Sequence, residues 1–348
     1  MKYRKITVVF MLVATILLSS FSFYAYQMVY AANFLVDEQT KILVIEEDET
    51  FKSLQNKLYD SRYVNDLVSF SFLAKMMDFD KAIKPGRYTI KANSNNLQVI
   101  RMLRLGAQTP VRITFNNVRL KEGLAEKITP NLLMTDVQFN AALDSFVERH
   151  DIFTPENVIA MFIPNTYEVY FNISGADLMK RMESEFNSFW NDERIEKAKE
   201  LGLKPTEIVT LASIVQAESV KKEESKIIAG LYINRLKKDI ALQADPTLVF
   251  ASGDFGLKRV LNIHKEIDSP YNTYLNTGLP PGPINMPPIY TIDAVLNYEQ
   301  HNYIFMVAKE DFSGYHNFAE TYREHINNAN RYQRQLSIEQ RKARMNKN

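Results

Sequence analysis

The 348-residue sequence contains no cysteine. This absence excludes disulfide cross-links, thiolate catalysis and cysteine-ligated metal sites. An excess of charge of one sign is also missing, because 42 Lys and Arg residues balance 41 Asp and Glu residues and leave a net charge of +1. Such a balance gives no general electrostatic attraction to nucleic acid, so we expect no nucleic-acid partner.

Several catalytic motifs are also missing. The sequence has no P-loop, no GxGxxG dinucleotide fingerprint, no GxSxG elbow and no HExxH. Of its five histidines, none has the spacing from a second ligand that would form a metal site on one helix face. His316 and His325 are nine positions apart and do not share a helix face. The sequence therefore predicts neither a metal nor a cofactor.

Charged residues are absent from residues 6–36, which follow Lys2, Arg4 and Lys5. A bilayer core needs about 20 apolar residues in a helix, whereas the apolar part of a signal peptide has about 7–15. We therefore expect a transmembrane helix over 6–30 in the cytoplasmic (inner) membrane. Because positive charge precedes the span, residues 1–5 are expected in the cytoplasm and the rest of the chain outside. The alternative is a signal peptide cleaved near the sequence YAAN.

The predicted fold class is α+β, and the first folded part is a small module over 38–108. A strand is expected at 42–45, followed by a helix with Thr50 as its N-cap. A second helix is expected over 66–77, and a third ends at Gly106, whose lack of a side chain suits a C-cap. A module of about 65 residues has a size that can fold by itself.

Residues 109–335 predict a larger, mostly helical α+β domain. Val111, Ile113 and Phe115 alternate with polar residues, as in a half-buried strand. The segment 151–172 has no clear period and is expected to be irregular. Helices are expected over 174–200, 205–219, 223–238 and 291–298, with a strand at 303–309 and a closing helix.

Two segments are predicted to lack regular structure. The loop over 268–288 is long and rich in Pro, Gly and Asn, and Tyr271, Tyr274 and Leu279 are expected to anchor it in an ordered form. The last segment, 336–348, is polar and basic and is expected to form a frayed, solvated tail.

The stretch LASIVQAESVKKEE, residues 211–224, places a carboxylate on an apolar helix face. Ile208, Leu211 and Val215 form one stripe, and position 218 continues it with a glutamate. Desolvation raises the pKa of a carboxyl group, so Glu218 is predicted to be a general acid near neutral pH. The alternative is a structural ion pair with Arg235. We expect no other carboxylate in a comparable inward position.

Three motifs together resemble the endolytic murein transglycosylases of the YceG-like family. In chain order they are LASIVQAESVKKEESKIIAGLYINRLKKDIALQADPTLVFA, SPYNTYLNTGLPPGPI and GYHNFAETYREH. The resemblance runs from the N-terminal anchor to about residue 330. It implies that 38–108 is a LysM-like subdomain and that 109–335 is the YceG-like catalytic domain.

The resemblance also implies site residues. The catalytic glutamate of the family falls on Glu218, and Gln216 stands where many relatives have an acidic residue. In FIPNTYEVY, Asn165 replaces the usual Asp, so this segment is given no chemistry. Asp245 has a second interpretation, because it can also cap or brace its loop. The residues expected to bind substrate are Asn234, Gln243, Asp245, Thr247, Tyr271, Asn272, Thr273 and Tyr274.

The implied function is cleavage of nascent peptidoglycan glycan strands by a membrane-anchored lytic transglycosylase. Such an enzyme breaks the MurNAc–GlcNAc bond, leaves 1,6-anhydro-MurNAc ends and terminates strand elongation. Peptidoglycan synthases are candidate partners. Two alternatives stay open: a muramidase-type hydrolase with a second carboxylate, for which Asp245 is the candidate, and an anchored glycan-binding protein without activity.

Overall fold

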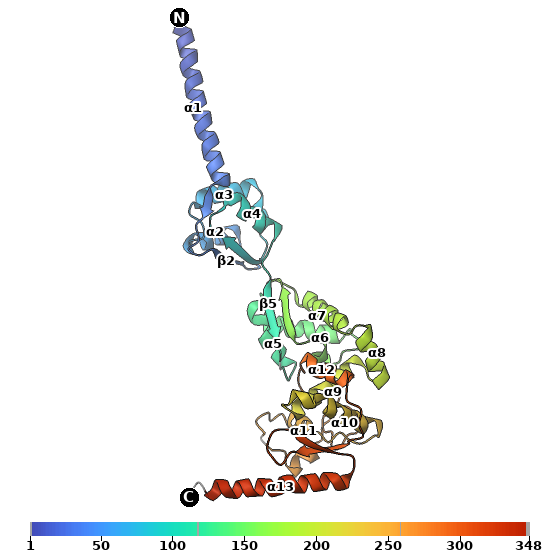
Figure 1. Ribbon diagram of the computed structural model, residues 1–348. Coiled ribbons are helices and arrows are strands. Elements are labelled where there is room, and N and C mark those ends of the chain that lie inside the picture. The colour runs from blue at the N-terminus through green and yellow to red at the C-terminus, as the bar shows by residue number, and fades with distance from the viewer. Residues whose placement is uncertain (1, 117, 258, 346–348) are drawn as a thin grey trace. The chain divides into compact units, whose positions relative to one another are not determined.

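The computed structural model describes residues 2–116, 118–257 and 259–345 (Figure 1). These residues divide into two compact units. The first unit runs to Ile113 and adds Asn131–Met134 and Glu168–Ile173, and the second holds the other described residues. Helices and short antiparallel strands alternate in both units, so the prediction of a mixed helix-and-strand fold is confirmed.

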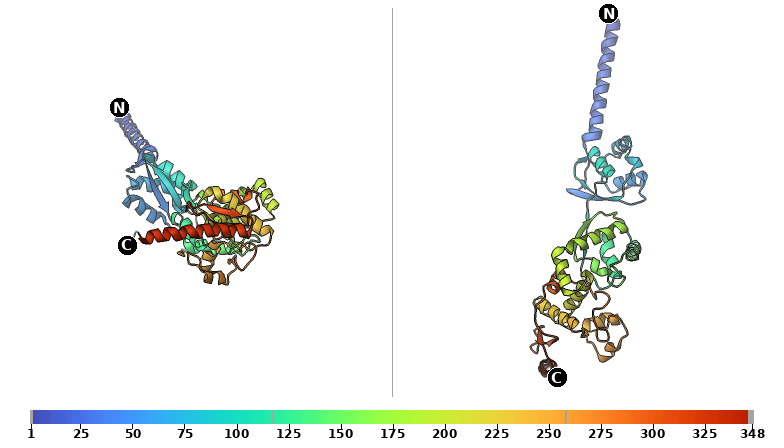
Figure 2. Two further views of the ribbon diagram at one scale, coloured as in Figure 1. Left: turned by 60° about the horizontal axis from the view of Figure 1, so that its bottom comes forward. Right: turned by 90° about the vertical axis from the view of Figure 1, so that its right-hand side faces the viewer.

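Helix α1 (Lys2–Tyr30) is one long helix (Figure 2), and from Ile6 onward it contains no charged residue. Among the described residues it is the one helix whose length and hydropathy suffice to cross a membrane, over Tyr3–Tyr30. The predicted apolar N-terminal helix is therefore confirmed. The direction in which it crosses stays a prediction, and Met1 of the predicted cytoplasmic segment lies outside the described residues.

Residues 32–105 of the first unit form a module of three α-helices and two small sheets around one apolar core. Strand β2 pairs antiparallel with β3, and β1 pairs with β4. Thr50 caps α2 by accepting a hydrogen bond from the backbone N–H of Ser53, and Gly106 ends α4 with a left-handed φ of 71°. The elements are β1 (Ala32–Phe34), β2 (Thr40–Ile45), α2 (Phe51–Asp60), α3 (Leu67–Met76), β3 (Gly86–Lys91), β4 (Ser94–Asn95) and α4 (Asn96–Leu105).

The core of this module explains its pattern of residues. Phe34, Leu43, Phe70 and Tyr88 are completely buried, and Leu43 and Ile45 lie two positions apart on the inner face of β2, as the period of a strand requires. The mixed architecture predicted for 38–108 is thus present. Its likeness to LysM stays a prediction.

The second unit is mostly helical. Strands β5 and β6 pair with each other, and each has residues in both units; β7 pairs antiparallel with β8. The elements are β5 (Val111–Phe115), α5 (Glu122–Ile128), α6 (Asp136–Val147), β6 (Asn165–Val169), α7 (Gly175–Phe189), α8 (Asp192–Leu201), α9 (Pro205–Glu218), α10 (Ser225–Lys237), α11 (Asp245–Ser252), α12 (Ile289–Leu296), β7 (Phe305–Ala308), β8 (His316–Ala319) and α13 (Tyr322–Met345).

The structure differs from the sequence pattern in three places. The helix predicted over 174–200 is two helices, because Asn191 accepts a hydrogen bond from the Arg194 backbone N–H and starts α8 as its N-cap. The segment expected to be irregular contains β6. The expected frayed tail is wrong up to Met345, since α13 has neither Pro nor Gly and continues in good helix formers. Residues 346–348 lie outside the described residues.

Helix α9 is the buried centre of the second unit. All its residues from Ile208 to Val215 are buried, and α10, α11 and α12 pack against it. Pro205 starts the helix at a position where no backbone donor is needed, and Glu218 is its last residue. The chain then leaves the helix in an extended conformation at Ser219.

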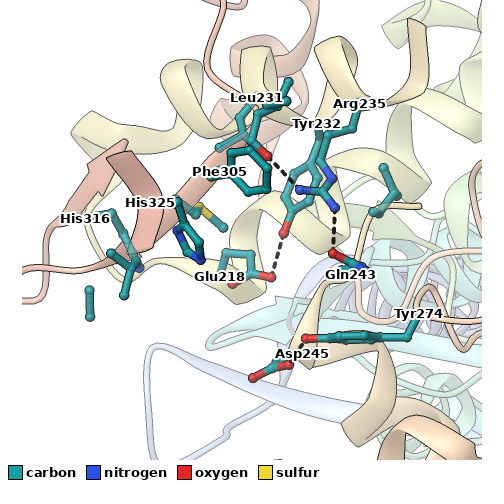
Figure 3. Close-up of a pocket in the computed structure, with 15 residues that line it drawn as sticks. Glu218, Leu231, Tyr232, Arg235, Gln243, Asp245, Tyr274, Phe305, His316 and His325 are labelled. Atoms are coloured by element: carbon teal, nitrogen blue, oxygen red, sulfur yellow. Dashed lines mark hydrogen bonds between the residues drawn. The ribbon is translucent and has the colours of Figure 1, made fainter. Parts of the chain in front are cut away.

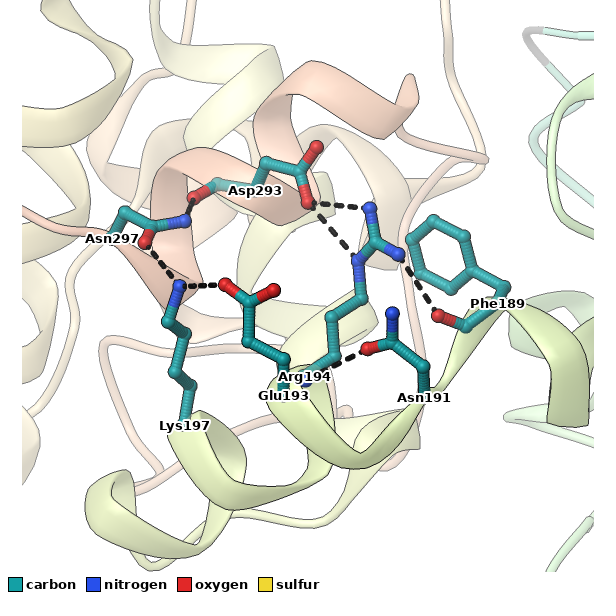
Figure 4. A network of polar contacts seen from close by, with 7 residues as sticks. All are labelled: Phe189, Asn191, Glu193, Arg194, Lys197, Asp293 and Asn297. Carbon is teal, nitrogen blue, oxygen red and sulfur yellow. Dashed lines mark hydrogen bonds and ion pairs between the residues drawn. The ribbon is translucent and has the colours of Figure 1, made fainter.

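Helix α12 is also held by α8 (Figure 4). The guanidinium group of Arg194 donates two hydrogen bonds to Asp293 Oδ1, at 3.2 and 3.1 Å, and lies over the ring of Phe189. The Lys197 ammonium group donates to Asn297 Oδ1 at 2.8 Å. These contacts hold the helix against which α9 packs.

The long loop 268–288 is ordered, as predicted, although it has no helix or strand of its own up to Pro288. The Asn272 amide donates to the carbonyl oxygens of Lys265 and Ile267. Farther along, the Ile284 backbone N–H donates to Ser213 Oγ, and the Asn285 amide donates to the Ser213 carbonyl oxygen in α9. The loop is therefore bonded directly to α9, the helix that carries Glu218.

A glycine substitution tests how closely the loop 268–288 packs on the chain at Glu156. A Cβ on Gly282 would lie 1.9 Å from the carbonyl oxygen of Glu156, so Gly282→Ala is expected to lower the free energy of unfolding by about 1–3 kcal/mol. The fluorescence of Trp190, the single tryptophan of the chain, reports this in urea titrations. Gly123→Ala is the control, because its Cβ would be 3.5 Å from Val118 Cγ1 and Ala favours the helix. Equal stability of the two variants would contradict the close packing.

Candidate functional site

Glu218 is the last residue of α9 and lines two pockets, the first of which is shown in Figure 3. The first, which we call the hairpin pocket, has a volume of about 350 Å³ and is closed on one side by β7, β8 and α13. The second, which we call the arginine pocket, has a volume of about 650 Å³ and contains Arg119 and Arg259. Glu218 and Asp245 line both pockets, so a ligand that passes Glu218 can occupy space on each side of it.

The Glu218 carboxyl group is held by one strong contact. The Tyr232 hydroxyl on α10 donates to Glu218 Oε1 at 2.7 Å. Burial raises the pKa of Glu218 to about 7, the Tyr232 hydrogen bond opposes this by favouring the carboxylate, and the charge of Asp245 adds to the rise. The raised pKa agrees with the position of Glu218 on the apolar stripe. A carboxyl group with this pKa is about half protonated at neutral pH and can both give and take a proton.

The alternative of a Glu218–Arg235 ion pair is wrong. The Arg235 guanidinium group donates to the carbonyl oxygens of Ala241 and Ile304 and to Gln243 Oε1, at 2.9, 2.6 and 2.8 Å. Among the ion pairs of the described residues none includes Glu218. Arg235 instead fixes the chain around Gln243, which has a left-handed φ of 52°.

A second carboxylate lies in the same site. Asp245 begins α11 and accepts a hydrogen bond from the Tyr274 hydroxyl at 2.6 Å. Burial and the contact with Asp245 raise the pKa of Tyr274 well above its usual value, so its hydroxyl keeps its proton and stays a donor. Tyr232 and Tyr274 thus each donate to one of the two carboxylates (Figure 3).

The expectation that Glu218 is the single inward carboxylate is wrong. Glu224 is 6% exposed. Its oxygens accept hydrogen bonds from the His316 backbone N–H and Nδ1, both at 2.8 Å, and from Ser219 Oγ at 3.1 Å. The run KKEE resembles a solvated turn, but a short 3₁₀ helix at Lys222–Glu224 turns this side chain inward. Since its partners take up both oxygens, Glu224 braces the end of α9 against β8.

Three of the eight residues expected to bind substrate line the hairpin pocket with Glu218: Gln243, Asp245 and Tyr274. Tyr271 lies elsewhere, in a small pocket with Glu156 and Ile159, and its ring packs on Phe250 at 4.5 Å. The structure therefore brings Gln243, Asp245 and Tyr274 to Glu218 and keeps Tyr271 apart from it.

The polar groups of the other four have partners inside the protein. The Asn234 amide donates to the carbonyl oxygens of His301 and Tyr303. Thr247 and Thr273 share a hydrogen bond of 2.8 Å, and Asn272 holds the loop described above. These contacts are those of bracing residues, and direct binding of substrate by these four stays a prediction.

Sequence reasoning missed Tyr232, His316 and His325, which all line the hairpin pocket. Tyr232 lies three positions before Arg235 on one face of α10, and this spacing was a usable signal. The two histidines come together because one is on β8 and the other on α13, which helix periodicity cannot reveal. No group of three or more His, Asp or Glu residues suited to a metal occurs in the part of the chain that the structure describes.

Comparisons with known proteins support the family resemblance. A model of the YceG-like family matches residues 43–331. An endolytic murein transglycosylase of Streptococcus pneumoniae (serotype 2, strain D39) is 25% identical over 87% of this chain and 61% of its own length. One of Bacillus subtilis (strain 168) is 38% identical over 43% of this chain and 40% of its own length. The chain thus spans less than two thirds of the curated relatives it matches.

A solved structure described as a yceG-like protein of Listeria monocytogenes is similar in fold. Its TM-score is 0.51 at 23% identity, and the match covers 83% of this chain and 98% of that one. This likeness supports the fold alone.

The Tyr232–Glu218 hydrogen bond can be tested by titration. Tyr232→Phe removes the donor that favours the carboxylate, so the pKa of Glu218 is expected to rise above about 7. The measurement is a ¹³C NMR titration of labelled glutamate carboxyl groups, with Glu218 assigned by its absence in Glu218→Gln. Tyr274→Phe is the matched control, because its hydroxyl contacts Asp245. An unchanged or lower pKa in Tyr232→Phe would refute this role.

The raised pKa also has a consequence for stability. Between the ordinary pKa of 4.5 and about 7, the folded chain holds a proton that the unfolded chain releases. The free energy of unfolding therefore falls as pH rises through this window. Glu218→Gln removes the effect and is expected to be more stable than the parent above about pH 7, by on the order of 1–3 kcal/mol.

The two chains are expected to be equally stable near about pH 4, where Glu218 is protonated in both states. Urea titrations followed by Trp190 fluorescence at both pH values measure the difference. Glu223→Gln serves as control, because that side chain is exposed. A stability gain that is the same at both pH values would show that the pKa of Glu218 is not raised in the folded chain.

Proposed function

Because this chain belongs to the YceG-like family, we propose that it is a membrane-anchored lytic transglycosylase that cleaves the glycan strands of peptidoglycan internally. The observation that carries the proposal is Glu218, a carboxyl group with a pKa of about 7 at the junction of two pockets. The names of the Streptococcus pneumoniae and Bacillus subtilis relatives support the same reaction.

The bond broken is the one between C1 of N-acetylmuramic acid and the O4 oxygen of N-acetylglucosamine. Glu218 donates its proton to this oxygen as the C1–O4 bond breaks, and positive charge develops on the muramyl ring. Because Tyr232 occupies Oε1, Oε2 is the oxygen that transfers the proton. Desolvation keeps enough of the acid form for this step near neutral pH.

The second step uses the same residue as a base. The Glu218 carboxylate takes the proton of the C6 hydroxyl group of the same muramyl residue while O6 forms a bond to C1. The product is a 1,6-anhydro-muramyl end, and Glu218 returns to its protonated form. The cycle consumes no water and needs no second carboxylate, and the Tyr232 hydroxyl supports Glu218 while it is charged.

Asp245 gives a second candidate function. It lines both pockets with Glu218, and two carboxylates on opposite sides of a sugar are the arrangement of a hydrolase, in which one activates water. The Tyr274 hydroxyl is bonded to one Asp245 oxygen, which favours a bracing role but leaves the other oxygen available. Products with reducing ends would identify this muramidase reaction.

The cellular setting is part of the proposal. Helix α1 anchors the chain in the cytoplasmic membrane with its N-terminus inside, so the pockets face the newly made glycan outside. Cleavage close to the membrane would terminate elongating strands, and peptidoglycan synthases are partners that fit this role. The first module, if it is LysM-like, would contact glycan or hold the second unit away from the bilayer.

The deciding experiment analyses products. The full chain in neutral detergent acts on uncrosslinked peptidoglycan strands, and mass spectrometry identifies the new ends. We expect anhydro-muramyl ends from the parent chain, and a rate at least about 10²-fold lower for Glu218→Gln. Glu223→Gln, an exposed change nearby, is expected to keep the parent rate.

The other outcomes separate the alternatives. Reducing ends that also require Asp245 would establish the hydrolase. Strand binding without cleavage by the parent chain would leave an anchored glycan-binding protein.

A further inference from the structure

The two pockets at Glu218 differ in their free positive charge. In the hairpin pocket the one arginine, Arg235, is engaged by the three acceptors described above. In the arginine pocket, Arg119 and Arg259 are exposed, and neither has an ion pair or a hydrogen bond among the described residues. The arginines available to a ligand therefore lie on one side of Glu218.

Arg119 is nevertheless held in place. Its guanidinium group lies 4.9 Å from the ring centroid of Phe255, which also lines the arginine pocket. Phe250 and Val249 add apolar wall beside it. A cation resting on an aromatic face loses little further freedom when it binds an anion, so this site is partly preorganised.

The pocket also contains an unsatisfied buried acceptor. Asn285 is 7% exposed, its amide nitrogen donates to the Ser213 carbonyl oxygen at 3.0 Å, and its Oδ1 has no partner among the described residues. The Ser213 contact fixes which end of the amide is the nitrogen. A donor such as an acetamido N–H or a sugar hydroxyl would satisfy Oδ1.

The two arginines are not paired with the catalytic carboxyl group. Glu218, Arg119 and Arg259 line one pocket of about 650 Å³, and no ion pair among the described residues joins Glu218 to either arginine. A pocket of this volume has room for a sugar ring beside Glu218.

We propose that the arginine pocket binds the muramyl residue of the strand, with Arg119 and Arg259 pairing with a carboxylate carried on its lactyl group. Asn285 Oδ1 accepts a hydrogen bond from the same sugar. The carboxylate is either the free lactyl group or a carboxylate of the stem peptide attached to it, and N-acetylglucosamine carries neither. This inference rests on the proposed function. It makes the two arginines specificity determinants, because they would set the direction in which the strand lies across Glu218.

The test is a binding measurement on the full chain in neutral detergent, with Glu218→Gln present so that no ligand is cleaved. Three ligands of similar length are compared: strands with stem peptides, strands from which an amidase has removed the peptides, and a chitin oligosaccharide, which has no carboxylate. The double variant Arg119→Ala/Arg259→Ala is expected to weaken binding of a carboxylate-bearing strand about 10-fold, because two exposed ion pairs are lost.

Controls separate charge from folding. Arg334→Ala removes an exposed arginine of α13 outside both pockets and is expected to change nothing. Arg119→Lys/Arg259→Lys keeps both charges and is expected to keep most of the preference, with a dependence on salt concentration. Trp190 fluorescence checks that each variant is folded.

The outcomes decide the proposal and its ligand. Weakening confined to peptide-free strands assigns the lactyl carboxylate, and weakening confined to peptide-bearing strands assigns the stem peptide. Unchanged binding of both strands, or equal weakening of the chitin oligosaccharide, overturns the proposal. A parent chain that binds with arginine dependence but never cleaves would refute the proposed activity alone, and cleavage without arginine dependence would refute the arginine pocket alone.

Discussion

The hydrogen bond from the Tyr232 hydroxyl to Glu218 Oε1 is the contact on which the site depends. Glu218 ends a helix that is buried from Ile208 to Val215, and burial of its carboxyl group raises the pKa to about 7. A buried carboxylate without a donor would be costly. One donor satisfies one oxygen and limits the rise in pKa, and the second oxygen has no hydrogen bond among the described residues.

The surrounding structure holds this arrangement from several sides. Helix α12 packs on α9 and is tied to α8 through Arg194 and Asp293. The loop at Ile284 and Asn285 bonds to Ser213 in the middle of α9. Glu224 joins Ser219, the residue after Glu218, to His316 on β8. The position of the acid is therefore set by elements that are distant in sequence.

The arginines of the site have two different roles. Arg235 is close enough in sequence to suggest a partner for Glu218, yet its three hydrogen bonds go to Ala241, Gln243 and Ile304. Its guanidinium group organises the chain that presents Asp245. Arg119 and Arg259, which have no such partners in the part of the chain that the structure describes, line the arginine pocket instead. A cation used for folding and cations left for a ligand are thus distinct, and this division gives the cleft a direction.

Local sequence determined the apolar first helix, the caps at Thr50 and Gly106, helix α9 and the inward glutamate at its end, because periodicity and capping act over a few residues. The local sequence pattern did not predict the break before Asn191, the strand β6 or the burial of Glu224. Only the tertiary structure decided that Tyr232 serves Glu218, that Arg235 does not, and that His316 and His325 share a pocket. The physical reason is that a hydrogen bond depends on distance and direction between chain segments, and spacing along one segment does not specify them.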